Sequence, residues 1–292
     1  MIDKLEMLIA LSHERHFGRA AAACHVTQPT LSSGLKSLEQ QLGVQLVQRG
    51  ARFIGLTPEG ERVLARAKTI VAEARALKSD VAVARLGLSG TLRLGVIPTA
   101  LAAVRALTRP FLDVHPGVRL RILSLNSHEI LDRLAEFEID AGLSYASADQ
   151  PSERLPGFRI RRLYEEEYSL VTRDHADLPA SLPWSALGAF ELGLLTPDMQ
   201  NRRIIDRNLA HAGITASPRI ESNSIVALVS HVTEHHSATI LPTTTAAFYA
   251  KGRDLACIPL TGSLGGISDV AFILPPVGRR TLLLDAFVSS LD

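Results

Sequence analysis

Apolar residues recur at every third or fourth position near the start of the chain, which is the spacing of amphipathic helices. The pattern predicts a helix over residues 4–14, a short alanine-rich helix over 19–24 and a third helix over 28–41. Thr27 stands where its hydroxyl can cap the third helix. The apolar residues of 44–57 are expected to form two short strands of a hairpin. These elements predict a small, mostly helical N-terminal domain.

A heptad pattern runs along residues 58–88, where apolar residues alternate in steps of three and four. Such a seam predicts one long helix that pairs with a second helix. No other segment predicts a helix of comparable length, so a second copy of the chain is the expected partner. The alternative is an amphipathic helix that packs on its own domain. The seam residues taken as dimerisation contacts are Val63, Ala67, Ile70, Ala74, Leu77 and Val81.

From residue 91 onward, short apolar strands alternate with helices, which predicts mostly parallel sheets with helical crossovers. The first strands are expected at 91–98, 118–125 and 139–145, with helices near 100–114 and 128–137. A second set of strands and helices follows, and the last strand, SDVAFILP, is expected to return to the first sheet. Two lobes joined by crossing segments would leave a cleft between them.

Composition and charge limit the class of protein. The chain has 292 residues and a net charge of +1, but residues 1–90 hold 12 basic and 8 acidic side chains. This excess indicates an N-terminal domain that faces a polyanion. Cys24 and Cys257 fit neither a disulfide framework nor a zinc motif. No stretch is apolar enough for a signal peptide or a membrane span, so we expect a cytoplasmic protein with no membrane partner.

A short helix, a turn and a second helix opened by Thr-Gln-Pro-Thr form a helix-turn-helix pattern. The alanines of the first helix allow the two helices to cross closely. On the second helix, Gln28 can pair with adenine, Thr30 and Ser33 can bond to bases or phosphates, and Lys36 can meet the DNA backbone. The pattern therefore predicts binding to double-stranded DNA.

The stretch FGRAAAACHVTQPTLSSGLKSLEQQLGVQLVQRGARFIGLTPEG closely resembles the N-terminal region of LysR-type transcriptional regulators. A weaker resemblance continues through LGVIPT, HPGVRLRI, EIDAGL and ATILP to the end of the chain. It implies a winged helix-turn-helix domain, a long linker helix and a two-lobed α/β effector domain like that of periplasmic binding proteins. Basic residues are expected in the wing. The DNA-binding residues expected are Arg19, Thr27, Gln28, Pro29, Thr30, Ser32, Ser33, Lys36, Arg49 and Arg52.

The resemblance also implies boundaries and assembly. The expected parts are 1–60 for DNA binding, 58–90 for the linker helix and 91–292 for the effector domain, with lobe 1 at about 91–160 and 267–292 and lobe 2 at about 161–266. Linker helices would form a homodimer, and two dimers would join through their effector domains into a tetramer on promoter DNA. RNA polymerase is a further expected partner. We expect neither a cofactor nor enzymatic activity.

The sequence departs from the family at three places. Many members carry an arginine where Ser33 stands and a longer polar residue in place of Gly34, so direct contact with bases is reduced here. Many have a glycine-rich segment where this chain has EHHSATILP. The edge of the second lobe is therefore expected to differ.

Polar side chains follow several predicted strands, where ligands of two-lobed α/β domains bind. Each of them can also be a plain helix cap or a solvated side chain. Hydroxyls and helix N-termini favour an anionic or carboxylate-bearing effector. The expected effector contacts are Thr99, Asn126, Ser127, His128, Thr196, Arg202, Ser222 and Asn223.

Other chemistry has weaker support. His231, His235 and His236 lack convergent cysteine or carboxylate ligands, so solvated histidines are favoured over a metal site. Cys257 has no nearby resolving thiol for a redox role. No nucleophile or phosphate-binding motif appears in its required context. The alternative function is a two-lobed solute-binding protein or enzyme with an accessory helix-turn-helix.

Overall fold

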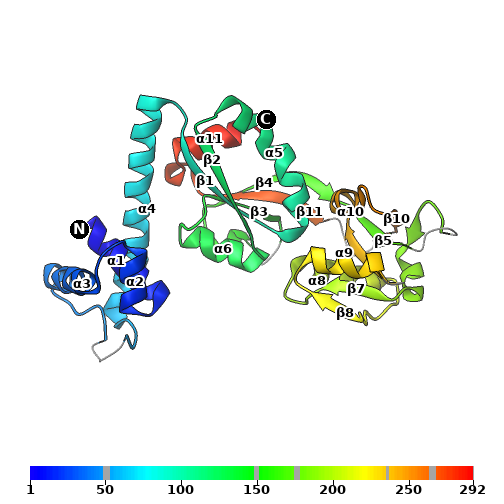
Figure 1. Cartoon of the computed structure of the whole chain (residues 1–292), viewed down its shortest axis with the longest axis horizontal. Helices are drawn as coiled ribbons and strands as arrows, with labels where there is room; N and C mark the ends of the chain where they lie inside the picture. Colours follow the sequence, from blue (N-terminus) through cyan, green and yellow to red (C-terminus); the bar gives the residue numbers. More distant parts are fainter. Residues whose placement is uncertain (49–52, 148–150, 174–177, 235–236, 263–267, 292) are drawn as a thin grey trace. The chain divides into compact units, whose positions relative to one another are not determined.

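The computed structural model describes residues 1–48, 53–147, 151–173, 178–234, 237–262 and 268–291. The chain forms two compact units, Met1–Gly87 and Leu88–Asp292 (Figure 1). No described helix is long and apolar enough to cross a membrane.

The described part of the first unit contains the helices α1 (Ile2–Glu14), α2 (Phe17–Ala23), α3 (Gln28–Leu42) and α4 (Pro58–Leu86). Leu8, Leu11, Leu31 and Leu38 are fully buried at the centre of its core. Ala20 of α2 is also completely buried, in line with the close helix crossing expected from the alanine run. The three short helices and the long one lie where the apolar periodicity predicts them.

The long helix α4 carries two apolar stripes. Leu64, Ala67 and Val71 are buried in the core of the first unit, where α4 packs on α1. Ala67 is only 1% exposed, so its assignment to a dimer seam is wrong: it packs within its own chain. At 100° per residue, Ile70 and Leu77 lie on an adjacent stripe that stays exposed. The single seam expected from the sequence is therefore two neighbouring faces.

The segment between α3 and α4 is pinned to the core at its base. Val47 and Leu56 form an antiparallel bridge, which is the part of the predicted hairpin that lies within the described residues. The Glu39 carboxylate of α3 accepts hydrogen bonds from the backbone N–H groups of Leu46 and Val47, at 2.8 and 3.2 Å. Arg49 and Arg52, expected in the wing, lie outside the described residues.

The first sheet of the second unit has the strand order β2-β1-β3-β11-β4. Its elements are β1 (Gly90–Val96), η1 (Pro98–Ala100), α5 (Leu101–Val114), β2 (Val118–Ser124), α6 (Ser127–Ala135), β3 (Ala141–Tyr145), α7 (Pro151–Arg154), β4 (Arg159–Glu166), β11 (Ser268–Leu274), η3 (Val277–Arg279) and α11 (Leu282–Ser289). The strands β1, β2 and β3 are parallel, whereas β11 is antiparallel to β3 and β4. Phe287 of α11 packs edge-on against Phe111 of α5, which puts both helices on one face.

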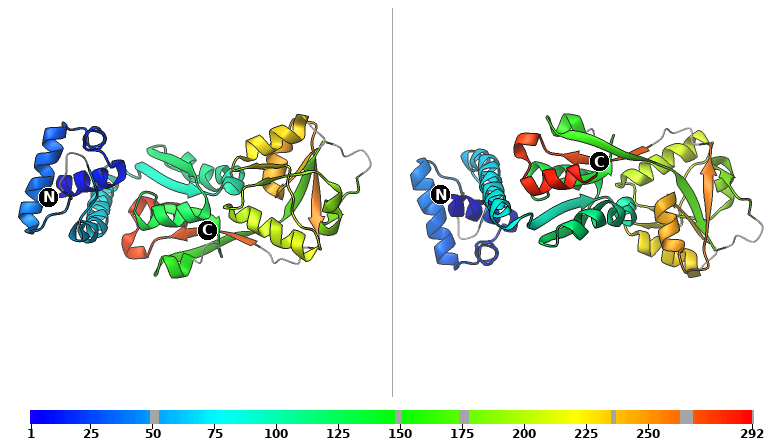
Figure 2. Two further views of the ribbon diagram at one scale, coloured as in Figure 1. Left: turned by 90° about the horizontal axis from the view of Figure 1, so that it is seen from below. Right: turned by 90° about the horizontal axis from the view of Figure 1, so that it is seen from above.

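The second sheet has the order β6-β10-β5-β9-β7-β8, and Figure 2 shows helices on both of its faces. Its elements are β5 (Tyr168–Thr172), β6 (Leu182–Pro183), η2 (Trp184–Ala189), β7 (Leu192–Leu195), α8 (Gln200–His211), β8 (Ile220–Ser222), α9 (Ile225–Glu234), β9 (Ala238–Pro242), α10 (Thr243–Ala250) and β10 (Ala256–Thr261). The strand β7 is parallel to both β8 and β9. The sequence pattern did not predict α10, β10 or the short β6.

Two segments connect the sheets. The chain leaves the first sheet at Glu166, the last residue of β4, and enters the second at Tyr168 in β5. It returns from β10 to β11, where Ser268 pairs with Glu166. The strand β4 thus runs past residue 160, where the sequence pattern places the change of lobe. Glu166 consequently lies at the junction of the two lobes.

Candidate DNA-binding and effector sites

The exposed face of α3 carries the side chains expected to contact DNA. The helix buries Leu31, Leu35 and Leu38 on one side. At 100° per residue, Pro29, Ser33 and Lys36 lie on the opposite side, while Gln28 is exposed at the first turn of the helix. The residues of this face that are exposed are Gln28, Pro29, Thr30, Ser33 and Lys36, and Ser32 is half-buried. Sequence reasoning and structure thus place these six side chains together at the surface.

Local contacts fix the start and the position of α3. Thr27 caps the helix, because its side-chain oxygen accepts a hydrogen bond from the Thr30 N–H at 3.4 Å and lies 2.8 Å from the Thr30 hydroxyl. The Lys4 ammonium of α1 donates to the Ser37 hydroxyl at 2.8 Å. These contacts determine where α3 begins and connect it to α1.

Gly34 has a packing reason. A Cβ at this position would lie 2.5 Å from the sulfur of Met7 on α1. A longer residue at this position would therefore require the Met7 side chain to move. Direct contact with DNA on this helix falls to the neighbouring side chains.

Arg19 is exposed but already has a partner. Its guanidinium donates to the Glu14 carboxylate at 3.1 Å and to the Glu14 carbonyl oxygen at 2.5 Å. With side-chain exposures of 66% and 38%, the pair is solvent-screened and stabilises the fold only weakly. Arg19 can therefore exchange this partner for a phosphate at little cost.

In the second unit, a cleft lies between the ends of the strands of the two lobes. Its inner pocket has a cavity volume of about 10 Å³ and is lined by Thr99, Asn126, Ser127, Tyr145 and Asn201, together with Ile97, Pro98, Leu195, Met199 and Gln200. Its outer pocket measures about 520 Å³ and includes Asn126, Glu129, Asp198 and Asn223 in its lining. Four expected effector contacts, Thr99, Asn126, Ser127 and Asn223, therefore line the cleft.

The other four expected contacts do not line either cleft pocket. Arg202 is wrong as an effector ligand: it is buried and forms ion pairs with Asp206 at 2.8 Å and Glu221 at 2.6 Å. It also donates to the carbonyl oxygen of Leu195 at 2.8 Å, which ties α8 to the end of β7. The guanidinium is occupied by the lobe's own framework.

His128, Thr196 and Ser222 have local roles or lie away from the pockets. His128 lies beside Asp132 at 3.6 Å on the exposed side of α6. The Ser222 hydroxyl accepts a hydrogen bond from the Ser224 N–H at 3.1 Å. The Thr196 hydroxyl is buried and has no hydrogen-bond partner among the described residues.

Asn126 and Ser127 lie at the start of α6. Asn126 caps the helix by accepting from the Glu129 N–H, and the Glu129 carboxylate accepts from the Asn126 N–H, both at 2.9 Å. The buried Ser127 hydroxyl accepts from the Ser144 hydroxyl at 3.0 Å. Asn126 is thus a structural cap that also lines the cleft.

Sequence reasoning missed a buried polar chain behind the inner pocket. Tyr145 donates to Glu166 Oε2 at 2.6 Å, and Tyr168 donates to the same oxygen at 2.9 Å. Asn201 Nδ2 donates to the Tyr145 hydroxyl oxygen, and the Thr99 hydroxyl lies 3.2 Å from it. Only the three-dimensional pairing brings these elements together. The sequence signals were that Tyr145 ends a predicted strand and that Thr99 follows another.

Glu166 is a buried carboxyl whose hydrogen-bond partners among the described residues are the hydroxyls of Tyr145 and Tyr168. It is 7% exposed, and its Oε1 has no hydrogen-bond partner among the described residues. Burial raises its pKa from 4.5 to about 7, although hydrogen bonds from Tyr145 and Tyr168 favour the ionised form. The junction of the lobes therefore contains a carboxyl that titrates near neutral pH.

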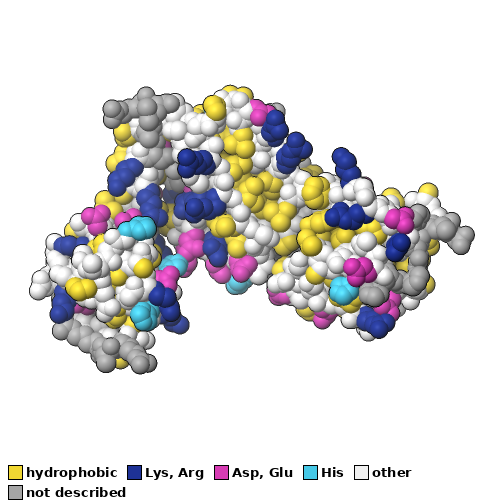
Figure 3. All heavy atoms as spheres, viewed as in Figure 1, with side chains coloured by type: hydrophobic (Ala, Val, Ile, Leu, Met, Phe, Trp, Pro, Cys, Tyr) yellow, Lys and Arg dark blue, Asp and Glu magenta, His cyan; other side chains and the backbone are white. Residues whose placement is uncertain are grey.

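The charge of the cleft is opposite to that of a neighbouring groove. Neither pocket of the cleft has a lysine or arginine among its described lining residues, and Glu129 and Asp198 line the outer one. The neighbouring groove between α5 and α10 measures about 630 Å³ and is lined by apolar side chains with Arg105 and Arg109. Figure 3 shows hydrophobic and basic side chains on the surface over α5. Basic groups are thus outside the cleft.

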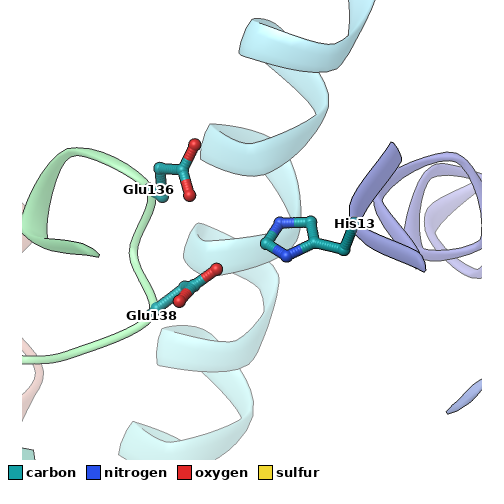
Figure 4. Close-up of side chains that lie close together, drawn as sticks. All are labelled: His13, Glu136 and Glu138. Carbon is teal, nitrogen blue, oxygen red and sulfur yellow. The ribbon is translucent and has the colours of Figure 1, made fainter. Parts of the chain in front are cut away.

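The sequence predicts no strong metal or thiol site, and we assign none among the described residues. His235 and His236 lie outside the described residues. Figure 4 labels His13 of the first unit with Glu136 and Glu138 of the second, and because they come from separate units we assign no metal site to them. Burial raises the pKa of both cysteine thiols, and Glu6 adds to this effect at Cys24.

Comparisons with known proteins agree with this architecture. Residues 2–61 match the model of the bacterial regulatory helix-turn-helix protein, lysR family, and residues 85–292 match the LysR substrate binding domain. A probable hydrogen peroxide-inducible genes activator of Streptomyces viridosporus is 32% identical over 249 residues, covering 83% of this chain and 78% of that protein. The HTH-type transcriptional regulator EstR of Acinetobacter baylyi is 30% identical over 247 residues, covering 82% and 79%.

A solved structure extends the likeness over the whole chain. Full-length OxyR of Pseudomonas aeruginosa, in a variant form, is 26% identical, with a TM-score of 0.73 that covers 100% of this chain and 94% of that one. The family models together match both units, and no comparison favours a solute-binding protein or an enzyme. The chain therefore belongs to the LysR family of DNA-binding transcriptional regulators, with an N-terminal helix-turn-helix domain and a C-terminal effector-binding domain.

Proposed function

We propose that the exposed face of α3 selects promoter sequence while nearby cations supply general affinity for DNA. The observation that carries the proposal is that Gln28, Pro29, Thr30, Ser33 and Lys36 of α3 are all exposed, whereas the leucines of the same helix are buried. The amide of Gln28 can pair with an adenine, and the hydroxyls can bond to bases or phosphates. Lys36 and Arg19 would contact phosphates.

The regulator acts in this proposal as a dimer, and two dimers form a tetramer on DNA. Ile70, Leu77 and Val81 are 47%, 67% and 52% exposed along one stripe of α4. Their spacing of seven and four residues is that of a heptad seam, and Ala74 lies between them. A second α4 on this stripe would bury these side chains and set the separation of two α3 helices on neighbouring half-sites.

The cleft of the second unit is the proposed effector site. A small molecule there would contact strand ends of both lobes, namely Thr99 and Asn126 of the first and Asn201 of the second. A molecule that binds one arrangement of the lobes more tightly than the other would shift an existing equilibrium between two states of the regulator. The described lining offers no cation for the anionic effector expected from sequence, so we do not extend that expectation.

The peroxide response in the names of some relatives is not extended to this chain. Neither Cys24 nor Cys257 lines the cleft pockets. Burial raises the pKa of both thiols, which lowers the fraction of reactive thiolate. We propose sensing by reversible binding, with no catalytic role, in the cytoplasm where promoter DNA and RNA polymerase are found.

Promoter binding by the full chain tests this function. Fluorescence anisotropy would compare the DNA upstream of its own gene with a shuffled duplex at several salt concentrations. The upstream DNA should bind more tightly, and the affinity for both should fall steeply as salt rises. Equal affinity for both duplexes at moderate salt would contradict the proposal.

A further inference from the structure

The inner pocket of the cleft contains an amide oxygen that lacks a partner. Asn201 is 3% exposed, and its Oδ1 has no hydrogen bond among the described residues. Asn201 also lines the inner pocket, at the start of α8. A buried acceptor without a donor raises the free energy of the folded state. The pocket is therefore built to receive a group that donates to this oxygen.

The buried carboxylate fixes the direction of every hydrogen bond in the chain behind the pocket. When it is ionised, Glu166 can only accept, so the single proton of the Tyr145 hydroxyl points to Glu166 Oε2. The Tyr145 oxygen is then an acceptor, and Asn201 must turn its Nδ2 toward it at 3.2 Å. The opposite orientation of the amide would bring two acceptor oxygens together. Asn201 is thus held with Oδ1 directed away from Tyr145.

The same rule applies to Thr99. Its Oγ1 lies 3.2 Å from the Tyr145 hydroxyl, whose proton is already used. Thr99 must therefore donate its own proton to Tyr145, which leaves the lone pairs of Oγ1 as acceptors. Thr99 and Asn201 come from different lobes, and both line the inner pocket. The inner pocket therefore contains two acceptors, Thr99 Oγ1 and Asn201 Oδ1. The second Nδ2 proton of Asn201 is the one side-chain proton of this pair that is not used in the bonds to Tyr145.

The size and charge of the inner pocket restrict which chemical groups of an effector can bind there. A cavity of about 10 Å³ holds roughly one water-sized group. A carboxylate has two oxygens and a carbon, so it exceeds this space. The outer pocket adds the carboxylates of Glu129 and Asp198, and its described lining includes no lysine or arginine. Backbone N–H groups in the first turn of a helix have no partner within the helix, so those of α8 can donate to acceptors on other parts of the effector.

We propose that the inner pocket binds a single hydrogen-bond-donating head group of the effector, a primary ammonium or a hydroxyl, which donates to Asn201 Oδ1 and Thr99 Oγ1, and that it rejects a carboxylate. This proposal rests on the proposed function of the cleft as the effector site. It adds the chemical class of the group that both lobes hold.

The test is a thermal-shift panel on the full chain at pH 8, where Glu166 is ionised. Compounds would be chosen in matched sets of three that share a carbon skeleton, such as butyl, cyclohexyl and benzyl, and that end in an amine, an alcohol or a carboxylate. At least one amine or alcohol should raise Tm by more than its matched carboxylate. Asn201→Leu, which keeps the branched shape of the side chain but removes both its acceptor and its Nδ2 donor to Tyr145, should abolish that shift.

Ser230→Ala, on the exposed side of α9, is the matched control and should keep the shift. Stabilisation by carboxylates alone, no stabilisation by any amine or alcohol, or an undiminished shift in Asn201→Leu would each overturn the proposal. Promoter binding by the same preparations, measured without added compound, distinguishes failure of the head-group proposal from failure of the proposed function. Intact promoter preference with a failed panel refutes the head-group assignment alone, whereas absent preference refutes the proposed function.

Discussion

The buried carboxyl at the junction of the lobes gives the most quantitative prediction. Replacement Glu166→Gln keeps an oxygen that can accept from Tyr145 and Tyr168, at 2.6 and 2.9 Å in the wild type, but removes the titration. Burial raises the pKa of Glu166 from 4.5 to about 7. The folded protein therefore binds a proton more tightly than the unfolded chain does.

The sign and size of the effect follow from linkage. Between about pH 4.5 and pH 7 the folded state holds more protons at this site, so the free energy of unfolding falls as pH rises. Each unit of pKa difference corresponds to about 1.4 kcal/mol, so the loss amounts to about 3 kcal/mol at pH 8. This contribution is fully present below pH 4.5 and is absent in Glu166→Gln.

Urea denaturation of both proteins at pH 5, 6, 7 and 8 measures the difference. Other titrating groups are common to the two proteins and cancel. Relative to Glu166→Gln, the wild type should lose most of this stability by pH 7. Parallel stability curves, or a wild type that gains relative stability as pH rises, would refute the assignment of a raised pKa to this carboxyl.

Three further predictions concern the first unit. Gly60→Ala should destabilise it by about 1–3 kcal/mol in a thermal melt, because a Cβ would lie 2.1 Å from the Leu46 carbonyl oxygen. Gly278→Ala is the control, because nothing lies within 4 Å of a Cβ at that position. Equal melting temperatures of the two variants would argue against the clash. Leu77→Glu should lower the mass measured by light scattering toward that of a monomer, whereas Thr69→Glu, on another face of α4, should not. An unchanged mass for both variants would exclude the proposed seam. Lys36→Ala should weaken binding to all duplexes alike and reduce the salt slope by about one; a change confined to the promoter would contradict a phosphate contact.

The DNA-binding face could be predicted from sequence because it depends on local periodicity. Buried leucines at positions 31, 35 and 38 fix which side of α3 is exposed, and Thr27 fixes where the helix begins. Such features need only one helix and its cap. The same holds for the strands β1, β2 and β3, whose short apolar runs are visible in the sequence.

The cleft could be predicted only in part, because its chemistry depends on long-range pairing. Thr99 and Asn126 follow strands of the first lobe, so their positions were accessible from the strand pattern. Arg202 has the right position in sequence, but Glu221 and Asp206 occupy its guanidinium. The role of Glu166 depends on Tyr145, which lies 21 residues away in sequence on a different strand. The sequence pattern predicts neither the ion pairs of Arg202 nor the hydrogen bond between Tyr145 and Glu166.

The long helix shows a different limit. Ala67 and Ile70 share one heptad pattern, but Ala67 is buried in the core of its own unit, whereas Ile70 is exposed. Periodicity identifies an apolar face but does not say whether its partner belongs to the same chain.

The central claim, that the polar face of α3 selects promoter DNA, is tested most directly with Gln28→Ala. Fluorescence anisotropy of the wild type and the variant would be measured on the upstream DNA and on duplexes with single base-pair changes. The account predicts that the variant loses about 1–3 kcal/mol of binding free energy and tolerates any base pair at one position of each half-site. A variant that binds the upstream DNA as tightly and as selectively as the wild type would contradict it.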